Sequence, residues 1–392
     1  MDPFNSRYIL NEKRWLWIDY DKGISIILVG YGHCMATLSD HGLPLSSYPF
    51  FNYIGVFLYG FRMPLFFIVS GLLVGRSLNK KGLGNYIGDR TNNILYPLFI
   101  WGAIQITLQL FMSRFTHNTV SPISYLDLII DPRQTGHFWY LNALFCIGVI
   151  YAVLKSKLKI KPVPHLIFGL VLFSISAYIH VYDRWAGFLT DICEYYIFFA
   201  LGDVLSNVML NDENRAKFAS WKIFIPLLVS FIVIQYFFTQ INLRPSSESI
   251  NYVEHKMPFF FLVEALVGCA ISINISFLLQ RSKALTFLRI IGFHSLFVYC
   301  MQIIVMTFAR TIFMNVMHIT YVPALIILVW WSGVILPVFF YNFCLKYGLW
   351  WLYTYRKPER QVAYMKTANI FWFDRNKKTV LKQEEEALMN TN

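Results

Sequence analysis

The chain contains the stretch IDYDKGISIILVGYGH at residues 18–33 and the stretch FRMPLFFIVSG at residues 61–71. Both stretches belong to apolar blocks of roughly 18 to 25 residues, the length that an α-helix needs to cross a hydrocarbon core of about 30 Å. Unpaired backbone groups are too costly in lipid for other structures, and the blocks show no barrel-like alternation. The two stretches therefore predict transmembrane helices that carry ionisable side chains.

The composition extends this prediction to the whole chain. Of the 392 residues, 56% are hydrophobic and only 14% are charged, which is more apolar side chain than a soluble fold can bury. We expect an all-α, polytopic integral membrane bundle of about ten transmembrane helices in contact with the lipid bilayer. To within about three residues, the expected spans are 21–38, 52–76, 92–112, 137–154, 163–181, 188–209, 221–239, 257–279, 291–314 and 321–345.

The sequence shows no internal repeat and no soluble domain. We expect one membrane domain at residues 1–345 and a cytoplasmic C-terminal tail at 346–392. The tail ends in a polar segment with Glu384, Glu385 and Glu386, which predicts a solvated surface helix or disorder.

The basic residues decide the expected orientation. Of the 34 Lys and Arg residues, 26 lie in the N-terminus, the even-numbered loops and the tail, whereas 5 lie in the odd-numbered loops. By the positive-inside rule, both termini are expected in the cytoplasm. The net charge of +12 therefore reflects helix ends, and no nucleic-acid partner is expected. The six cysteines lie in apolar blocks without paired spacing, so neither a disulfide framework nor a metal site is expected.

Ionisable residues inside a membrane are expensive and are candidates for function. The first expected helix carries Asp19 and Lys22 near its cytoplasmic mouth and His33 further in. The eleven-residue step from Lys22 to His33 is almost three turns, so both share a face about 16 Å apart. On the antiparallel second helix, Arg62 is expected at the same mid-membrane depth as His33. Such a pair suits acyl transfer, because histidine can take a hydroxyl proton and arginine can hold a carbonyl oxygen. It also fits a satisfied core histidine beside a structural ion-pair partner.

The amino-acid sequences of these two helices resemble those of the acyltransferase family 3 membrane proteins, especially the branch resembling fucose 4-O-acetylases. Residues 18–33 match the family pattern of an Asp, a basic residue three positions on, and a His after ten intervening residues. Residues 61–71 are similar to its aromatic, basic, Met-Pro-Leu-Phe-Phe and Ser-Gly segment. Lys22 departs from the Arg of the wider family, and Arg62 departs from the His that is frequent in the closest branch.

Further segments resemble the family more loosely. Arg90 followed by Tyr96 and Pro97 is similar to an Arg and a later Pro before the third helix. HFWYLNALF at residues 137–145 is similar to the opening of the fourth helix, and FFALGDVL at 198–205 to a later segment. HSLFVYCMQ at 294–302 is similar to a Ser-Leu, Tyr, then His pattern in which Gln302 here replaces the His.

The resemblance implies an acyltransferase of the bacterial inner membrane that uses acyl-CoA, with acetyl-CoA as the default donor. The acceptor would be a hydroxyl of a cell-envelope or exported carbohydrate, or of a lipid-linked glycan. His33 would be the catalytic base and Arg62 its partner, without a metal. The CoA-binding candidates are Lys22, Asp19, Arg90 and Arg76. The substrate-binding candidates are His137, Trp139 and Tyr140, at the outer mouth of the fourth helix, and Ser295, Tyr299 and Gln302.

Several alternatives stay open. A proton-coupled transporter of a small solute also has a mid-membrane His with charged neighbours, but no repeat symmetry and no pair of interrupted helices is apparent. Glu194, Glu264 and Arg310 fit interhelical ion pairs or a wet cavity wall better than catalysis. His33 could act as a general base or first accept the acyl group covalently. The acyl group, the acceptor and the oligomeric state are not determined by the sequence.

Reporter fusions test the orientation that the basic residues predict. Fusions after residues 45, 85, 125 and 158 should report outside, inside, outside and inside in turn, because basic loops are retained in the cytoplasm. A pattern out of phase with this order would overturn the topology.

Overall fold

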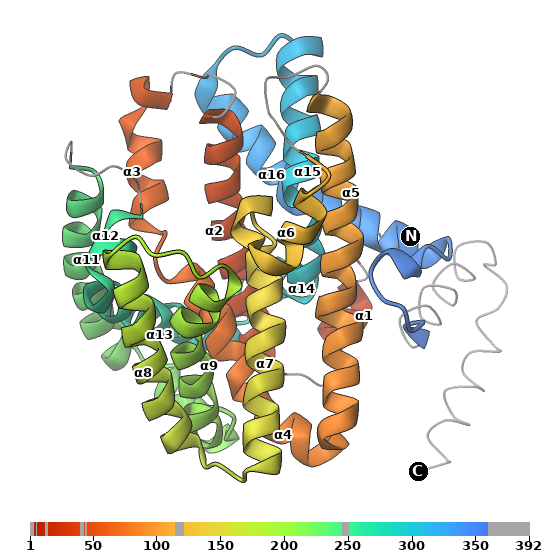
Figure 1. Ribbon diagram of the computed structural model, residues 1–392. Coiled ribbons are helices and arrows are strands. Elements are labelled where there is room, and N and C mark those ends of the chain that lie inside the picture. The colour runs from red at the N-terminus through yellow and green to blue at the C-terminus, as the bar shows by residue number, and fades with distance from the viewer. Residues whose placement is uncertain are drawn as a thin grey trace, which may run out of the picture.

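A computed structural model of the chain describes residues 4, 6–11, 15–39, 43, 45–113, 121–244 and 251–359. Within these ranges every regular element is a helix, and the helices form one elongated bundle (Figure 1). The expected all-α fold class is confirmed. The polar end of the tail, including Glu384, lies outside the described residues.

The long helices are α2 (Leu16–Ser39), α4 (Arg62–Arg90), α5 (Tyr96–Ser113), α7 (Trp139–Lys157), α8 (Pro162–Val181), α9 (Phe188–Met209), α11 (Trp221–Asn242), α13 (Pro258–Ser282), α15 (Ser295–Thr311) and α16 (Val322–Lys346). The short α-helices are α1 (Ser6–Asn11), α3 (Pro49–Phe57), α6 (Ser124–Ile130), α10 (Arg215–Phe218), α12 (Tyr252–Lys256) and α14 (Phe287–Phe293). Single turns of 3₁₀-helix are η1 (Leu45–Ser47), η3 (Pro132–Thr135), η4 (Asp212–Asn214) and η6 (Trp350–Leu352), and π-helical turns are η2 (Thr91–Leu95) and η5 (Ile312–Val316).

Each expected span overlaps a long helix, but fewer helical stretches qualify as membrane-spanning by length and composition alone. In the described part of the chain, seven helical stretches are long and apolar enough to cross a membrane. One of them runs from Pro49 to Met112 and contains α3, α4 and most of α5. Helices α2 and α9 are not among the seven, and both bury acidic side chains, such as Asp21 and Asp191. The number of stretches is therefore seven and not ten for two reasons. Helices α3 to α5 form one stretch, and the polar groups on α2 and α9 exclude these two helices.

The prediction that the chain has no pair of interrupted helices is wrong. The expected span 52–76 is broken at residues 58–61, between α3 and α4. The expected span 291–314 is broken at His294, between α14 and α15. The reason in the first case is a turn around Gly60, and Arg62 thereby becomes the first residue of α4. Broken helices at membrane depth are tolerated where the freed backbone is buried in protein or lines a cavity.

The second expected helix also continues further than the sequence suggests. Helix α4 extends through the predicted loop 76–91, with one break at Gly82, whose φ of 74° lies in the region that favours glycine. It passes directly into the π-helical turn η2, which leads into α5. The connection between the two spans is therefore helical almost throughout.

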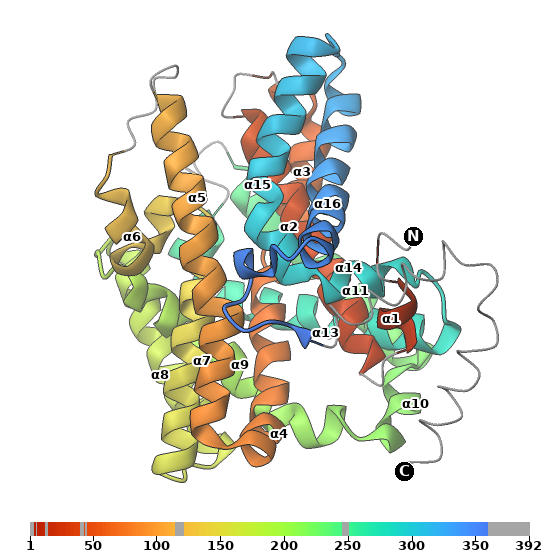
Figure 2. The same ribbon diagram turned by 90° about the vertical axis from the view of Figure 1, so that its right-hand side faces the viewer.

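The arrangement of the loops agrees with the expected alternation. The connection from α7 to α8, which carries Lys159 and Lys161, lies at the lower end of the bundle (Figure 1). The connection from α15 to α16, which has no Lys or Arg, lies at the upper end in both views (Figures 1 and 2). The start of the expected tail packs against the bundle, since the buried Tyr353 donates a hydrogen bond to the Met301 sulfur at 2.7 Å.

Helix α2 contacts α13, α14, α15 and α16 as well as α4. Its Asp21 is fully buried, and the hydroxyls of Ser272 and Ser276 on α13 donate hydrogen bonds to Oδ1 at 2.8 and 3.2 Å. A Cβ on Gly292 of α14 would lie 1.8 Å from the Asp19 carbonyl oxygen, so the two backbones cross in direct contact. Protein therefore surrounds the polar half of α2.

Helices α4 and α9 make the most extensive contact in the bundle. A Cβ on Gly71 of α4 would lie 1.9 Å from the Phe199 carbonyl oxygen, and a Cβ on Gly202 of α9 would lie 2.1 Å from the Ile68 carbonyl oxygen. Two glycines thus permit the close crossing that fixes Arg62 and Ser70 on α4 relative to the rest of the bundle.

Gly71→Ala should lower the thermal stability of the detergent-solubilised protein, because α4 and α9 must separate to admit the methyl group. Overpacking of this kind typically costs about 1–3 kcal/mol. The matched control is Gly84→Ala in the same helix, where nothing lies within 4 Å of the new Cβ. Thermal unfolding followed by size-exclusion chromatography should separate the two variants, and equal melting temperatures would contradict the close crossing.

Candidate active site

Three aromatic side chains from separate elements meet inside the bundle. His33 is on α2, His137 precedes α7, and Tyr299 is on α15. The ring centroids of His33 and His137 are 5.5 Å apart, with the rings inclined at 67°. The Tyr299 ring lies 5.0 Å from His137 and 6.4 Å from His33, and its hydroxyl donates a hydrogen bond to the His137 carbonyl oxygen. Two of the expected substrate-binding residues therefore lie beside the expected base.

Two side chains near His33 carry polar atoms that lack a partner. In the described part of the chain, both ring nitrogens of His137 and both amide atoms of Gln302 are buried without a hydrogen bond. The Gln302 Oε1 atom lies 3.4 Å from where a Cβ on Gly30 would be, one turn before His33. Because buried polar groups in native proteins are almost always paired, these atoms indicate a place that receives a polar ligand.

The Arg62 side chain, from the first residue of α4, packs against α2, the helix that carries His33. Its Nη1 donates a hydrogen bond to the Leu28 carbonyl oxygen at 3.0 Å. A Cβ on Gly32, the residue before His33, would lie 2.4 Å from that nitrogen, so only glycine leaves room for the guanidinium. The other face of the guanidinium group is 4.8 Å from the centre of the Tyr59 ring. The arginine is thus held beside His33.

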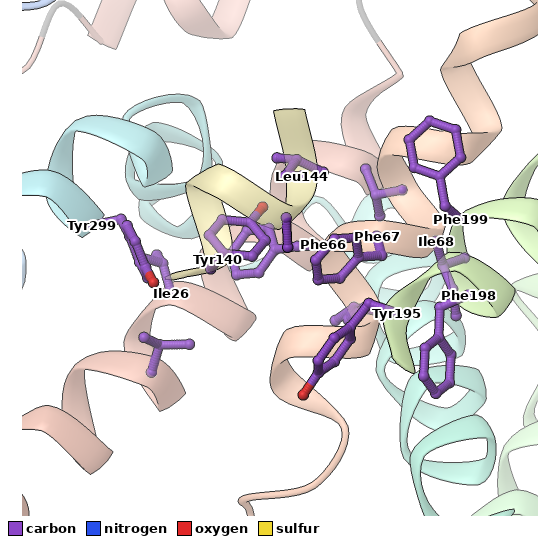
Figure 3. Packing of buried hydrophobic residues seen from close by; sticks show 14 of the residues in the cluster. Ile26, Phe66, Phe67, Ile68, Tyr140, Leu144, Tyr195, Phe198, Phe199 and Tyr299 are labelled. Atoms are coloured by element: carbon purple, nitrogen blue, oxygen red, sulfur yellow. The ribbon is translucent and has the colours of Figure 1, made fainter. Parts of the chain in front are cut away.

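A cavity of about 190 Å³ lies between α2, α4, η2, α7 and α15. Its lining residues are Lys22, Phe66, Ser70, Asn93, Ile94, Tyr140, Leu144, Ser295, Leu296 and Tyr299. Figure 3 shows Tyr299 beside Tyr140, with Phe66 and Phe67 beyond, and the Tyr140 and Tyr299 ring centroids are 5.1 Å apart. Four residues expected to bind donor or acceptor therefore line one space.

The cavity is lined by Lys22, and the histidines adjoin its wall through Tyr299. The Tyr299 ring contacts both His33 and His137. Lys22 and His33 lie eleven residues apart within the single helix α2, about 16 Å along its axis. The elements that contribute Asn93 and Ser295 are a π-helical turn and the first residue of α15, so irregular backbone lines part of this space.

The remaining CoA-binding candidates lie elsewhere. Arg90 packs inward, where its Nε donates to the Tyr86 hydroxyl at 2.9 Å and its Nη1 donates to the Leu144 carbonyl oxygen at 3.4 Å. Arg76 faces a separate, open groove of about 790 Å³ together with Trp15 and Arg215. Asp19 is buried at the crossing of α2 and α14. The structure therefore brings neither Arg76 nor Asp19 into the cavity that Lys22 lines.

Trp139 and Tyr140, which are expected to bind substrate at the outer mouth of the fourth helix, both contact protein side chains in the structure. Both α6 and η3 contact α7 (Figure 1). Tyr140 is buried and lines the cavity, whereas the Trp139 ring lies 5.2 Å from the Tyr195 ring with the Arg133 guanidinium 4.6 Å from its centre.

A cluster of charged side chains around Arg133 lies next to Trp139. It was not predicted from the sequence. The Arg133 Nε is 2.6 Å from Asp191 Oδ1, and its Nη2 is 3.6 Å from Glu194 Oε2. Glu194 Oε2 also lies 3.0 Å from the His180 Nε2. The expected ion-pair reading of Glu194 therefore agrees with its contacts. Glu264 is likewise buried, and Gln235 on α11 donates a hydrogen bond to it.

Glu254 connects this charge cluster to Arg62. The Tyr59 hydroxyl donates to Glu254 Oε2 at 2.6 Å and the Tyr195 hydroxyl donates to Oε1 at 3.1 Å, while the Tyr59 ring stacks on Arg62. Burial alone would raise the pKa of Glu254, but Arg133, His255 and the Tyr59 hydroxyl lower it below its usual value. The ionised Glu254 therefore stabilises the folded protein fully above the pKa of an unfolded glutamate. This contribution to the free energy of unfolding is lost as the pH falls through the lower pKa of the folded state.

No spacing in the sequence predicts this cluster, since its members come from four separate elements: Arg133 from η3, His180 from α8, Asp191 from α9 and Glu254 from α12. In the part of the chain that the structure describes, no group of three or more His, Cys, Asp or Glu residues could hold a metal ion.

Comparison with known proteins agrees with the motif resemblance. The acyltransferase domain family, acyltransferase family 3, matches residues 15–357. The chain is 27% identical over 224 residues to nodulation protein NolL of Sinorhizobium fredii (strain NBRC 101917 / NGR234), covering 54% of this chain and 56% of that protein. It is 30% identical over 151 residues to nodulation protein NolL of Mesorhizobium japonicum (strain LMG 29417 / CECT 9101 / MAFF 303099), covering 37% of each.

A third similar protein is inner membrane protein YcfT of Escherichia coli (strain K12), at 33% identity over 94 residues, covering 22% of this chain and 26% of that protein. The chain thus matches little more than half the length of the first of these relatives, and less of the others. No solved structure matches the chain.

Proposed function

The chain belongs to acyltransferase family 3, a family of polytopic membrane proteins, and we propose that it is a membrane-bound O-acyltransferase. It moves an acyl group, by default acetyl, from cytoplasmic acyl-CoA to a hydroxyl of a cell-envelope or exported carbohydrate. The protein lies in a bacterial inner membrane with both termini in the cytoplasm. The similarity to an inner membrane protein of Escherichia coli and the distribution of Lys and Arg support this location.

One observation carries the proposal. A cavity is lined by Lys22, Tyr140 and Tyr299, and the Tyr299 ring contacts two histidines, one of which has both ring nitrogens unpaired within the described residues. A donor with a charged end at Lys22 and a reactive end near Tyr299 would occupy this space. Acyl-CoA is a donor of this kind.

The donor end of the site is assigned to Lys22. An ammonium at the mouth attracts the phosphates of CoA as a point charge, without the bidentate grip of arginine. Beyond it, Ser70 and Asn93 offer polar groups to the amides of the pantetheine arm, and Ser295 does so near Tyr299. Arg90 supports this wall through the Leu144 carbonyl, since Leu144 itself lines the cavity.

The chemistry is assigned to His33 and Arg62. His33 takes the proton of the acceptor hydroxyl as its oxygen attacks the thioester carbon. Arg62 has donors besides the one given to Leu28, and these stabilise the negative charge that develops on the carbonyl oxygen. Gln302, whose amide is buried without a partner, orients the acceptor hydroxyl.

A proton-coupled transporter remains the rival function. The helix interruptions at residues 58–61 and at His294 favour it, because transporters place substrate sites at broken helices. The buried cluster of Arg133, Glu194 and Glu254 also fits a proton relay. A transporter would leave glycans unmodified, so the two functions differ in a measurable product.

His33→Ala should abolish acyl transfer while the protein still folds and inserts. Loss of a general base typically lowers the rate by about 10² to 10⁴. Cells that lack the protein, and cells that express the parent or the variant, are compared by mass spectrometry of their envelope glycans. The matched control is His318→Ala, at an exposed position between α15 and α16. An acylation level in His33→Ala close to that of the parent would show that the base is elsewhere, and no acylation with the parent would favour the transporter.

Lys22→Ala should raise the KM for acyl-CoA more than it lowers kcat, which is the sign of lost ground-state binding. Lys22→Arg should bind the donor at least as tightly, because a guanidinium suits phosphate geometry. Titration calorimetry with a non-hydrolysable acyl-CoA analogue measures the affinity directly.

The control for Lys22→Ala is Lys81→Ala, which removes an exposed lysine paired with Asp89 on the same side of the protein. If Lys22 serves only in helix packing or orientation, its replacement will reduce expression or invert the topology while donor affinity stays unchanged. That result would contradict the role in binding CoA.

A further inference from the structure

His137 is placed as a reacting group and not as a packing residue. Its side chain is only 3% exposed, yet both ring nitrogens lack a hydrogen-bond partner in the described residues. A neutral imidazole has one nitrogen that donates and one that accepts. A single contact to substrate would satisfy one nitrogen and leave the other buried and unpaired, so the site accommodates one partner on each side of the ring.

The position of His137 is fixed by its neighbours. The Tyr299 hydroxyl donates a hydrogen bond to its carbonyl oxygen, and the Phe138 ring lies 4.2 Å from its ring centre. Tyr299 also lines the cavity that Lys22 lines. His137 therefore contacts a residue of the cavity wall, and its ring centre lies 5.5 Å from that of His33.

We propose that His137 is a second catalytic histidine, which relays the proton collected by His33 to the sulfur of CoA. This inference rests on the proposed acyl transfer and extends it to the leaving group. A thiolate expelled inside a protein cavity is a costly charge, because it loses most of the hydration that it would have in bulk water. A proton delivered at that moment removes the cost.

The acceptor oxygen bonds to the thioester carbon, and its proton moves to His33. The carbon–sulfur bond breaks as His33 passes this proton to one nitrogen of His137 and the other nitrogen of His137 gives its own proton to sulfur. The products are the ester and CoA thiol. Both histidines end neutral, with His137 in its other tautomer until it exchanges with water after CoA leaves.

The experiment compares two donors that differ in their need for that proton. Thiol release is measured with water as the acyl acceptor, first from acetyl-CoA and then from S-phenyl thioacetate, whose thiolate leaves without protonation. The full-length protein is used in detergent as the parent, His137→Gln, His33→Ala and His318→Gln. The last variant makes the same substitution at the exposed position between α15 and α16.

His137→Gln should lower turnover of acetyl-CoA by about 10²-fold or more, the usual size of a lost proton-transfer catalyst, and should affect S-phenyl thioacetate far less. His33→Ala should impair both donors alike, and His318→Gln neither. Equal losses with both donors in His137→Gln would overturn the relay and leave His137 a binding residue. Unchanged rates with both donors would remove it from the reaction altogether.

A second variant guards against a folding defect. His137→Gly leaves a space beside His33, and added imidazole should restore turnover of acetyl-CoA if the ring carries protons. Absence of rescue in a protein that elutes and melts like the parent would count against the relay. The base itself is judged separately, because a His33→Ala protein that is fully active with both donors contradicts the proposed function, whatever His137 does.

Discussion

The structure depends on the high cost of placing a polar or charged group in lipid. Helix α2 carries Asp21, Lys22 and His33, and such a helix is stable in a membrane only when other helices enclose its polar face. Helices α13 to α16 enclose it on one side and α4 on another. Ser272 and Ser276 donate hydrogen bonds to Asp21 Oδ1, so the enclosure is chemical as well as steric. The polar face of α2, and with it the candidate site, therefore lies inside the bundle and not toward lipid.

The same cost explains where the helices are broken. A broken helix frees backbone groups, and these are tolerated where they line an internal space. Ser295, at the start of α15, and Asn93, in the π-helical turn after α4, both line the cavity. The Arg62 side chain, directly after the break at residues 58–61, likewise lies against α2 at Leu28 and Gly32, next to the candidate base His33. The irregularities of the fold and its candidate chemistry thus coincide.

The sequence predicted the parts of this arrangement that are local. Lys22 and His33 could be assigned to one helix because a helical repeat relates them, and the apolar blocks gave the long helices. The break at residues 58–61 could not be predicted, because Leu58, Tyr59 and Phe61 are apolar and leave the apolar block in the sequence uninterrupted. The direction of Arg76 depends on how α4 packs, so its groove could not be predicted either. The cluster of Arg133 and Glu254 joins distant segments and needs the folded structure to be seen.

The link through Tyr59 has a consequence for how this protein can vary. Glu254 belongs to a short helix between two spans, a kind of segment that ordinarily accepts replacement. Here it holds the hydroxyl of a tyrosine whose ring packs on Arg62. A neutral residue at position 254 would leave that hydroxyl without its acceptor and would remove negative charge from the neighbourhood of the arginine. A substitution in this connecting segment would therefore change the surroundings of an arginine in the interior of the bundle.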